Sequence, residues 1–404
     1  MDTKPVTVGI IGLGEIGELH ARVILGDRYR RPPEKRAKKM DLVGTGRRLA
    51  RTLLGRGRPA RPKEPDPGVE DIEIGAVSDL DERRLALVKE NAGIRDGYTD
   101  YKKLLARSDI EAVLVDTPPA SHPEITIAAA CAGKHVFCEK PMAMSSADCE
   151  KMIEATQKAG VVLQIGYVLR ASSERGRIRD AILSGQIGRP VFFQYIMSPR
   201  GGSPQRWVFD ERLGGGPLWE YSHGLDFVRH IFGDPEVVFG IGGRYKPEKT
   251  SAVDTLAVCL SFASGDKVLF ADSYALRGFG WDIRGCRPHR LQIDVMGPKG
   301  FIQFPDKDLS QKLTICTYED SQDRVEKIPW KSTWGANGYK EELRQFADSV
   351  RSGKPPSVPG EEGLRTVQLL ETVMHSMATG SVCRFADRLP SSGPLRRPQG
   401  LAHP

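Results

Sequence analysis

A pair of charged residues follows a short apolar run in the first half of the chain. Glu139 and Lys140 come directly after residues 135–138, a pattern that predicts a buried strand with two charges at its end. In a doubly wound sheet, the carboxyl ends of the strands are where ligands bind. An ammonium group there can donate a hydrogen bond to a hydroxyl or carbonyl oxygen and stabilise negative charge as it develops. A structural ion pair is the alternative interpretation of the same two residues.

A histidine with acidic neighbours forms a second candidate group. Glu220, His223 and Asp226 are spaced by three residues after Pro217, and a proline that follows a run of glycines is a typical helix start. On a helix this spacing places the three side chains close to one face. Two carboxylates beside an imidazole orient it and favour its charged form, so we expect His223 to act as a general base. Local salt links on a helix surface are the other interpretation.

The elements that must position these groups begin with the first strand. The apolar run at residues 6–11 predicts a strand, which leads at once into a G-x-G-x-x-G motif and a helical pattern. In this setting the glycines allow a tight turn, close approach to a pyrophosphate, and close packing of helix on strand. The helix N-terminus then directs its free N–H groups at the phosphates. The expected cofactor-binding residues of the motif are Gly12, Gly14, Glu15, Ile16 and Gly17.

The choice of cofactor depends on the end of the second strand, expected at residues 72–79. Asp79 can accept hydrogen bonds from a ribose and repel a 2′-phosphate, so we expect NAD, with NADP as the alternative. A basic insert explains why Asp79 lies farther from the glycines than the usual interval of about twenty residues. Arg83 and Arg84 could instead meet a phosphate. If Asp79 were only a helix N-cap, the sequence would not decide between the two cofactors.

Composition places the chain among ordinary globular proteins. Its 404 residues predict at least two domains, and its hydrophobic and charged fractions, 39% and 27%, are unremarkable. Neither a signal-peptide pattern nor an apolar stretch of membrane-spanning length is visible, so we expect a cytoplasmic protein without a membrane partner. The seven cysteines are scattered and include no C-x-x-C pair. We therefore expect neither a disulfide framework nor a metal site.

The net charge of +7 comes from one segment. Residues 28–63 carry fourteen Lys and Arg against two acidic residues, a local charge of +12, so the rest of the chain carries −5. A connection between the first helix and the second strand lies at the sheet edge opposite the ligands. We expect residues 28–68 to be a solvated insert, with a contact to another domain or subunit as an alternative. Nucleic acid is not favoured as a partner, because Tyr29 is the segment's one aromatic residue.

Several motifs in this order resemble the Gfo/Idh/MocA family, which includes glucose-fructose oxidoreductase and inositol dehydrogenase. They are the glycine motif at 12–17, Thr117-Pro118-Pro119 with His122, Glu139-Lys140-Pro141, and later similarities at 185–188, 214–216 and 339–356. The resemblance implies nicotinamide-dependent oxidation or reduction of a sugar or polyol by a homo-oligomer. Two alternatives stay open: an NADP-dependent reductase of another carbonyl or imine, and a non-catalytic NAD-binding regulatory or scaffold protein.

The resemblance also implies roles for individual residues. Lys140 corresponds to the catalytic lysine, His223 to the base, and Glu220 to an acid that is more often aspartate and one residue farther from the histidine. The residues implied for the cofactor site are Thr117, Pro118, His122, Glu139 and Lys140. The residues implied for the substrate site are Tyr167, Arg170, Asp226 and Trp207, although Val168 stands where asparagine is frequent.

The expected fold class is α/β with two domains. Residues 1–141 should form a Rossmann domain with a doubly wound parallel sheet, and residues 142–387 a C-terminal α/β domain with an open, mostly antiparallel sheet. Strand-like runs in the second domain lie at residues 191–198, 237–245, 255–262, 268–276, 291–297 and 313–317. A helix over residues 361–377 should return to the first domain, and residues 388–404 should form a disordered tail.

Overall fold

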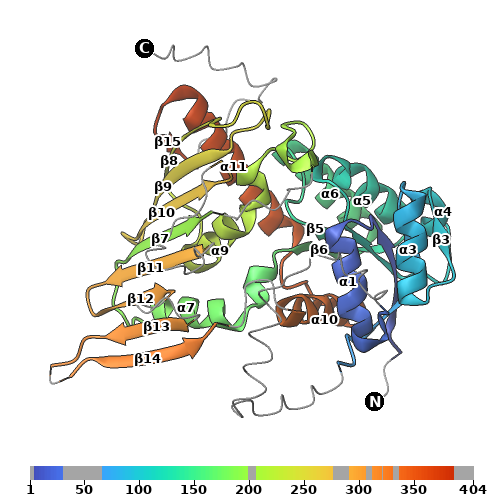
Figure 1. Ribbon diagram of the computed structural model, residues 1–404, viewed down its shortest axis with the longest axis horizontal. Helices are drawn as coiled ribbons and strands as arrows, with labels where there is room; N and C mark the ends of the chain where they lie inside the picture. Colours follow the sequence, from blue (N-terminus) through green and yellow to red (C-terminus); the bar gives the residue numbers. More distant parts are fainter. Residues whose placement is uncertain are drawn as a thin grey trace, which may run out of the picture.

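A computed structural model describes residues 4–30, 66–198, 206–275, 291–305, 312–320, 322–330 and 336–385. Within these ranges the chain forms two sheets with helices around and between them (Figure 1). Most of the basic insert and the expected disordered tail lie outside the described residues.

The first sheet, sheet A, has six parallel strands in the order β3-β2-β1-β4-β5-β6. Its strands are β1 Val6–Ile11, β2 Ile72–Ser78, β3 Gly97–Tyr98, β4 Ala112–Val115, β5 His135–Glu139 and β6 Leu163–Gly166. Its helices are α1 Glu15–Leu25, α3 Glu82–Ala92, α4 Tyr101–Leu105, α5 His122–Cys131 and α6 Ser146–Ala159. The expected doubly wound Rossmann sheet is confirmed. Its strand order reverses between β1 and β4, which is where such sheets bind ligands.

Local sequence explains these elements. All four residues of β4 are buried, as a strand covered by helices on both faces requires. Helix α3 begins after Asp81, whose carboxylate accepts hydrogen bonds from the Arg83 and Arg84 backbone N–H groups, and ends at Gly93 in the left-handed conformation. The cap of this helix is thus Asp81 and not Asp79.

Strand β6 pairs with β5 in sheet A. The expected domain boundary after residue 141 therefore falls inside the first sheet, between β5 and β6. The run Leu163–Gly166 is short and carries Gln164, so its sequence alone did not indicate a strand.

The second sheet, sheet B, has nine strands in the order β14-β13-β12-β11-β7-β10-β9-β8-β15. Its strands are β7 Phe192–Met197, β8 Val237–Gly243, β9 Thr255–Ser261, β10 Lys267–Ser273, β11 Leu291–Gly297, β12 Gly300–Phe304, β13 Lys312–Thr317, β14 Arg324–Pro329 and β15 Cys383–Arg384. All pairings are antiparallel except that of β10 with β7. The expected open, mostly antiparallel sheet is confirmed, and β12, β14 and β15 are additions to the expected strands.

The remaining α-helices either cover one face of sheet B or pack against sheet A. They are α7 Ser173–Leu183, α8 Pro217–Glu220, α9 Ser222–Phe232, α10 Ala336–Ser352 and α11 Gly360–Thr379. In Figure 1, α7, α9 and α11 lie on the side of sheet B that faces sheet A. Helix α11 packs on both α6 and β8, so the expected return of this segment to the first domain is confirmed. Helix α10 packs against α1.

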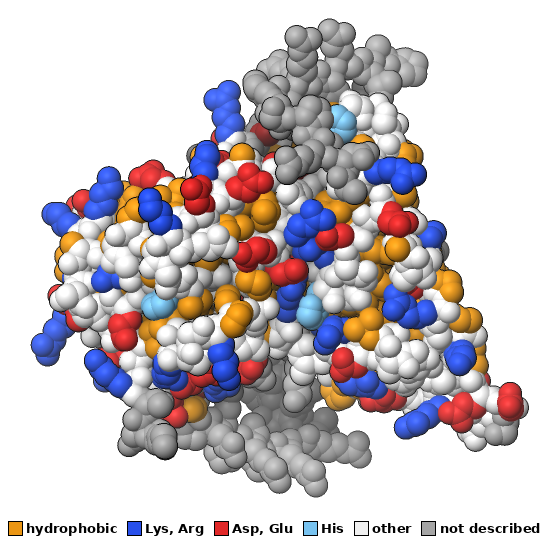
Figure 2. All heavy atoms as spheres, turned by 180° about the vertical axis from the view of Figure 1, so that it is seen from behind, with side chains coloured by type: hydrophobic (Ala, Val, Ile, Leu, Met, Phe, Trp, Pro, Cys, Tyr) orange, Lys and Arg blue, Asp and Glu red, His pale blue; other side chains and the backbone are white. Residues whose placement is uncertain are grey.

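The described surface is mixed in charge. Figure 2 shows basic and acidic side chains intermixed over one face of the molecule, without a large area of a single sign. Among the helices of the described part, none combines the length and apolar character that crossing a bilayer requires.

Candidate active site

The glycine motif forms a tight cradle at the carboxyl end of β1. Gly12 has a φ of +93°, and a Cβ there would lie 2.7 Å from the Asp116 carbonyl oxygen. A Cβ on Gly17 would lie 1.9 Å from the Gly12 carbonyl oxygen. Helix α1 starts at Glu15 after Gly14, and no side chain caps it. Its first N–H groups are thus available to an anion, which fits a dinucleotide pyrophosphate.

Asp79 lies beside this cradle. One carboxylate oxygen accepts a hydrogen bond from the Leu13 backbone N–H at 2.6 Å, and the other accepts one from the Asp81 N–H at 2.8 Å. Because Asp81 caps α3, the interpretation of Asp79 as a helix N-cap is wrong. The position of Asp79 at the end of β2, against the glycine loop, fits a ribose-binding acid.

The loop after β4 forms the other wall of the cradle. A Cβ on Gly12 would lie 2.8 Å from Cγ2 of Thr117, so Thr117 and the following Pro118 adjoin the glycine motif. His122 is fully buried, and its Nε2 and Nδ1 lie 2.7 and 3.0 Å from the carbonyl oxygens of Thr117 and Pro141. Burial lowers the pKa of His122. His122 therefore ties the loops after β4 and β5 together, and its burial speaks against the direct cofactor contact expected for it.

Lys140 brings the two halves of the molecule together. Its Nζ donates a hydrogen bond to the Glu220 carbonyl oxygen at 2.8 Å and lies 3.3 Å from one Glu220 carboxylate oxygen. The Lys140 side chain is almost wholly buried, whereas that of Glu220 is partly exposed. Glu220 therefore holds the ammonium of Lys140 at the end of β5.

The surroundings of His223 differ from the expectation. The helix is interrupted at Tyr221, so Glu220 ends α8 while His223 lies in the first turn of α9. The carboxylate of Glu220 turns to Lys140, and that of Asp226 pairs with Arg170. Burial lowers the pKa of His223 well below its usual value, and the cationic Lys140 and Arg175 lower it further. The expected support of the charged imidazole by two carboxylates is therefore wrong.

Arg170 and Asp226 neutralise each other. The Arg170 guanidinium donates two hydrogen bonds to the Asp226 carboxylate, at 2.9 and 2.7 Å, and a third to Glu362 on α11 at 2.7 Å. Asp226 has no exposed surface. Asp226, which was expected at the substrate, is paired with Arg170 here, and the pair ties α9 and the short helix η3 (Val168–Ala171) to α11. Charged side chains are rarely fully buried unless they are paired, so a salt bridge between Arg170 and Asp226 was the alternative to a substrate contact.

The other two expected substrate residues lie near the same region. Tyr167 is buried, and its ring packs edge-on against that of His223 with centroids 5.9 Å apart. Trp207 belongs to the short helix η4 (Arg206–Phe209), and its carbonyl oxygen would lie 2.6 Å from a Cβ on Gly214. The glycine run before α8 therefore lets the chain pass close to Trp207.

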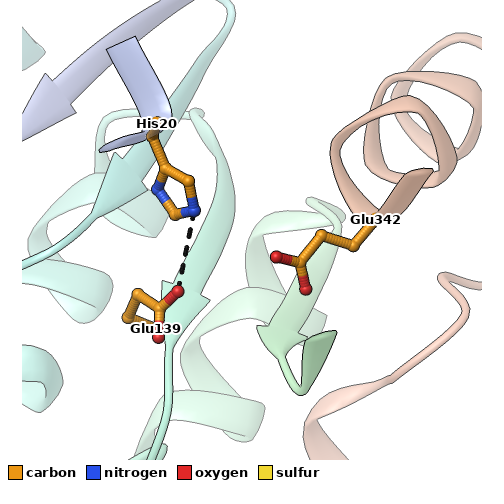
Figure 3. Close-up of side chains that lie close together, drawn as sticks. All are labelled: His20, Glu139 and Glu342. Atoms are coloured by element: carbon orange, nitrogen blue, oxygen red, sulfur yellow. Dashed lines mark ion pairs between the residues drawn. The ribbon is translucent and has the colours of Figure 1, made fainter. Parts of the chain in front are cut away.

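A buried cluster behind Lys140 was not expected from the sequence. Its side chains are those of His20 on α1, Asp116 after β4, Glu139 on β5 and Glu342 on α10. Figure 3 shows His20, Glu139 and Glu342 directed toward one another from three separate elements. The one signal for His20 was its place a single turn after Gly17, which does not distinguish a buried histidine from an exposed one.

The glycine cradle and the buried lysine are typical of a nucleotide-dependent oxidoreductase. Comparison with known proteins identifies the family. Residues 38–167 match an oxidoreductase family described by its NAD-binding Rossmann fold, and residues 179–384 match the C-terminal alpha/beta domain of the same family. The chain belongs to the Gfo/Idh/MocA oxidoreductase family, which confirms the resemblance of its motifs. It is an NAD-binding oxidoreductase of the dehydrogenase and reductase type.

Individual relatives support the same assignment. A myo-inositol 2-dehydrogenase of Thermotoga maritima is 33% identical over 301 residues, which cover 73% of this chain and 86% of the relative. A 1,5-anhydro-D-fructose reductase of Ensifer adhaerens is 29% identical over 323 residues, covering 77% and 90%. The crystal structure of a probable dehydrogenase from Thermotoga maritima is 28% identical, with a TM-score of 0.67 over 94% of this chain and 99% of that chain.

Proposed function

We propose that the protein transfers a hydride between NAD and a CH–OH or carbonyl carbon of a sugar, a sugar derivative or a cyclitol. The observation that carries this proposal is the position of Lys140, whose ammonium leaves the end of β5 and meets Glu220 from the second domain close to His223. The relatives named for inositol and for anhydrofructose support a polyhydroxylated substrate. The NADP alternative gains no support from the site, because the negative charge of Asp79 disfavours a 2′-phosphate.

The proposed catalytic roles follow from charge and burial. When bound, NAD supplies the hydride acceptor, held by the glycine cradle with its ribose near Asp79. His223 accepts the hydroxyl proton, because its lowered pKa keeps the imidazole neutral at physiological pH. Lys140 donates a hydrogen bond to the substrate oxygen and stabilises the alkoxide as it forms. In the reverse direction, protonated His223 is a strong acid for the same reason.

Glu220 has a supporting role in this scheme. Its carbonyl and carboxylate hold the Lys140 ammonium at 2.8 and 3.3 Å. A substrate hydroxyl that accepts a hydrogen bond from Lys140 can donate one to the partly exposed Glu220 carboxylate. We therefore propose that Glu220 orients both Lys140 and the substrate and does not serve as the base.

We also propose that the protein is a homo-oligomer that uses the outer face of sheet B. A row of paired residues crosses that face: Phe192, Met296, Phe301, Cys316 and Val325. Three of them are apolar and well exposed, Phe192 at 38%, Met296 at 49% and Val325 at 54%. An apolar row on a sheet face that the described helices leave open is typical of a contact between subunits.

The cysteines support a reducing compartment, and we propose a cytoplasmic location. Cys131, Cys138, Cys149, Cys259 and Cys383 are free thiols. Proteins of oxidising compartments more often pair their cysteines.

The first test is to denature the purified protein and identify any nucleotide released. In parallel, the native protein is given NAD or NADP with a panel of inositols, aldoses, anhydrosugars and glycosides, and reduced cofactor is followed at equilibrium and over time. We expect NAD-dependent turnover of at least one polyol. A preference for NADP would contradict the role of Asp79, and cofactor binding without turnover of any polyol would favour the regulatory alternative.

A further inference from the structure

The cluster behind Lys140 contains more carboxyl groups than its buried surroundings allow to be ionised at the same time. Asp116, Glu139 and Glu342 surround one imidazole, that of His20, and all four side chains are more than nine-tenths buried. The rings of Phe137 and Tyr339 pack edge-on against His20, with centroids 5.5 and 5.7 Å away, so the site is walled by apolar surface. Three carboxylates with one imidazolium and the nearby ammonium of Lys140 would leave a net charge of −1 there. At least one carboxyl group must therefore keep its proton.

The contacts within the cluster indicate which carboxyl group that is. The two oxygens of Asp116 lie 2.9 and 3.1 Å from Nδ1 of His20. Glu139 accepts a hydrogen bond from the Lys140 backbone N–H with one oxygen, and its other oxygen lies 3.6 Å from Nε2 of His20. Neither oxygen of Glu342 has a hydrogen-bond partner among the residues that the structure describes. Since none of the described donors stabilises Glu342 as an anion, Glu342 is the carboxyl group expected to stay neutral.

A neutral Glu342 has a proton to donate. Its carboxyl oxygen lies within 4.8 Å of both a ring nitrogen of His20 and a carboxylate oxygen of Glu139 (Figure 3). A hydrogen bond from the Glu342 carboxyl group to Glu139 requires the two oxygens to approach each other from that separation. Helix α10 would then be hydrogen-bonded, through Glu342, to the Glu139 carboxylate. The other oxygen of that carboxylate accepts the hydrogen bond from the Lys140 backbone N–H.

We propose that Glu342 is a positioning residue for Lys140: it keeps a proton and donates it in a hydrogen bond to Glu139, whose carboxylate anchors the Lys140 backbone. This inference rests on the catalytic role proposed for Lys140. It links α10, near the end of the chain, to a lysine about two hundred residues earlier. Glu342 acts only through Glu139 and contacts neither substrate nor cofactor.

The charges around the cluster agree with this assignment. The facing groups are His20 from α1, Asp116 after β4, Cys138, Glu139 and Lys140 from β5 and its end, Tyr339 and Glu342 from α10, and Glu220 from α8. Burial raises the pKa of Glu342 well above its usual value, and the nearby Glu139 and Asp116 raise it further. Burial would lower the pKa of His20, but Asp116 and Glu139 raise it above its usual value.

The test compares Glu342→Gln with Glu342→Ala. Glutamine has a donor in the place of the carboxyl proton and should retain the hydrogen bond to Glu139, whereas alanine removes it. We expect Glu342→Ala to lower kcat by about tenfold or more, as misplacement of a catalytic group does, while NADH affinity stays within about twofold. Glu342→Gln should stay close to the wild type in both. Glu341→Gln, on the same helix with a hydrogen bond to Gln345, is the matched control.

Several outcomes would overturn the proposal. If Glu342→Gln loses as much activity as Glu342→Ala, the residue is needed as an anion. One equivalent of bound divalent metal in the purified wild type, lost in Glu342→Gln, would identify a metal site instead. A lower melting temperature in Glu342→Ala with unchanged kcat would show a role in stability alone. If Glu342→Ala does not fold, Glu342→Leu removes the donor while filling the space, and the same loss of kcat is expected.

A second readout separates this inference from the proposed function. The rate at which formaldehyde and borohydride methylate Lys140 is measured by mass spectrometry, with exposed Lys102 as the internal reference. We expect a faster reaction of Lys140 in Glu342→Ala and Glu342→Leu than in the wild type and Glu342→Gln. Equal rates in all four proteins would contradict the positioning role. Because this measurement needs no substrate, it remains informative even if no polyol is oxidised.

Discussion

The ammonium of Lys140 lies 2.8 Å from the carbonyl oxygen of Glu220, a residue eighty positions later in the chain. This contact joins the carboxyl end of a strand in sheet A to the short helix that precedes α9. A single buried cation is thus held by both halves of the molecule, next to a histidine whose pKa is lowered partly by that cation. The relationship suits a reaction in which charge develops on an oxygen between the two residues.

Replacing Lys140 tests the oxygen-stabilising role. Lys140→Ala removes the one cationic donor proposed for the substrate oxygen, and we expect kcat to fall by about 10²–10³-fold. NAD affinity, measured by fluorescence titration with NADH, should change little because the glycine cradle is intact. Lys151→Ala is the control, since Lys151 is an exposed lysine on α6 that pairs with Asp148. A Lys140→Ala enzyme with near-normal turnover would exclude the assignment.

The pH dependence of the reaction tests His223. As the pKa of its imidazole lies well below the usual value, the neutral base is present throughout the range above pH 6.5. We expect His223 itself to contribute no decline in kcat for alcohol oxidation from about pH 8 down to 6.5, so a decline in that range that Glu139→Gln removes belongs to Glu139. The reverse reduction should accelerate as pH falls, because it requires the protonated form. A midpoint above 6.5 that disappears in His223→Ala, and not in the control His230→Ala, would contradict the lowered pKa.

Asp79 and Asp81 offer a matched pair for cofactor choice. Asp79→Ala removes the charge that repels a 2′-phosphate, so we expect kcat/KM for NADP to rise relative to that for NAD by about tenfold. Asp81→Ala removes the N-cap of α3 and should destabilise the fold by about 1 kcal/mol without changing the cofactor ratio. Both ratios come from initial rates with the two cofactors. An equal effect of the two substitutions would indicate that Asp79 acts only on local structure.

Gly12 and Gly160 separate backbone strain from cofactor binding. Both have positive φ, +93° and +66°, so alanine at either costs about 1 kcal/mol of conformational strain. A Cβ on Gly12 also meets backbone atoms of Asp116 within 3 Å, whereas one on Gly160 meets nothing within 4 Å. We expect Gly12→Ala to lose NADH binding in a fluorescence titration and Gly160→Ala to retain it. Loss of binding in both variants would point to general destabilisation.

The acid cluster predicts how stability depends on pH. Burial raises the pKa of Glu139 to about 7, although His20 and Lys140 oppose the shift. A group whose pKa is higher in the folded state binds its proton more tightly there, so its contribution to stability is full below pH 4.5 and is lost as pH rises through 7. We expect the free energy of unfolding to fall by a few kcal/mol between about pH 5 and 8, measured by urea titration. Glu139→Gln should flatten that dependence, and the exposed control Glu150→Gln should not.

The fold could be read from the sequence wherever the signal is local. The apolar run of β1 followed by Gly12, Gly14 and Gly17 needs no long-range partner to identify a dinucleotide cradle, because each glycine answers a short-range steric demand. The strands of sheet B with alternating or continuous apolar residues were expected for the same reason. Strands β6 and β14 were missed because one is very short and the other, Arg324–Pro329, is mostly exposed and polar.

The sequence predicted only part of the candidate active site. Lys140 and His223 were singled out from residue type and position, yet the partner of each differs from the expectation. Glu220 was expected beside His223 and binds Lys140, and Asp226 was expected at the substrate and binds Arg170. Helical spacing predicts which side chains share a face, but the break at Tyr221 turns Glu220 away from that face. No local pattern in the chain predicts such a break in the helix.

By itself, the sequence determined the class of fold, the cofactor cradle and the identity of the lysine and histidine, because these depend on backbone conformation and periodicity within short segments. The tertiary structure decided which charges meet. The pairing of Lys140 with Glu220, the neutral state of His223, and the burial of Glu342 beside Glu139 all depend on groups brought together from distant parts of the chain. Electrostatic energy depends on distance and burial, and neither quantity is present until the chain has folded.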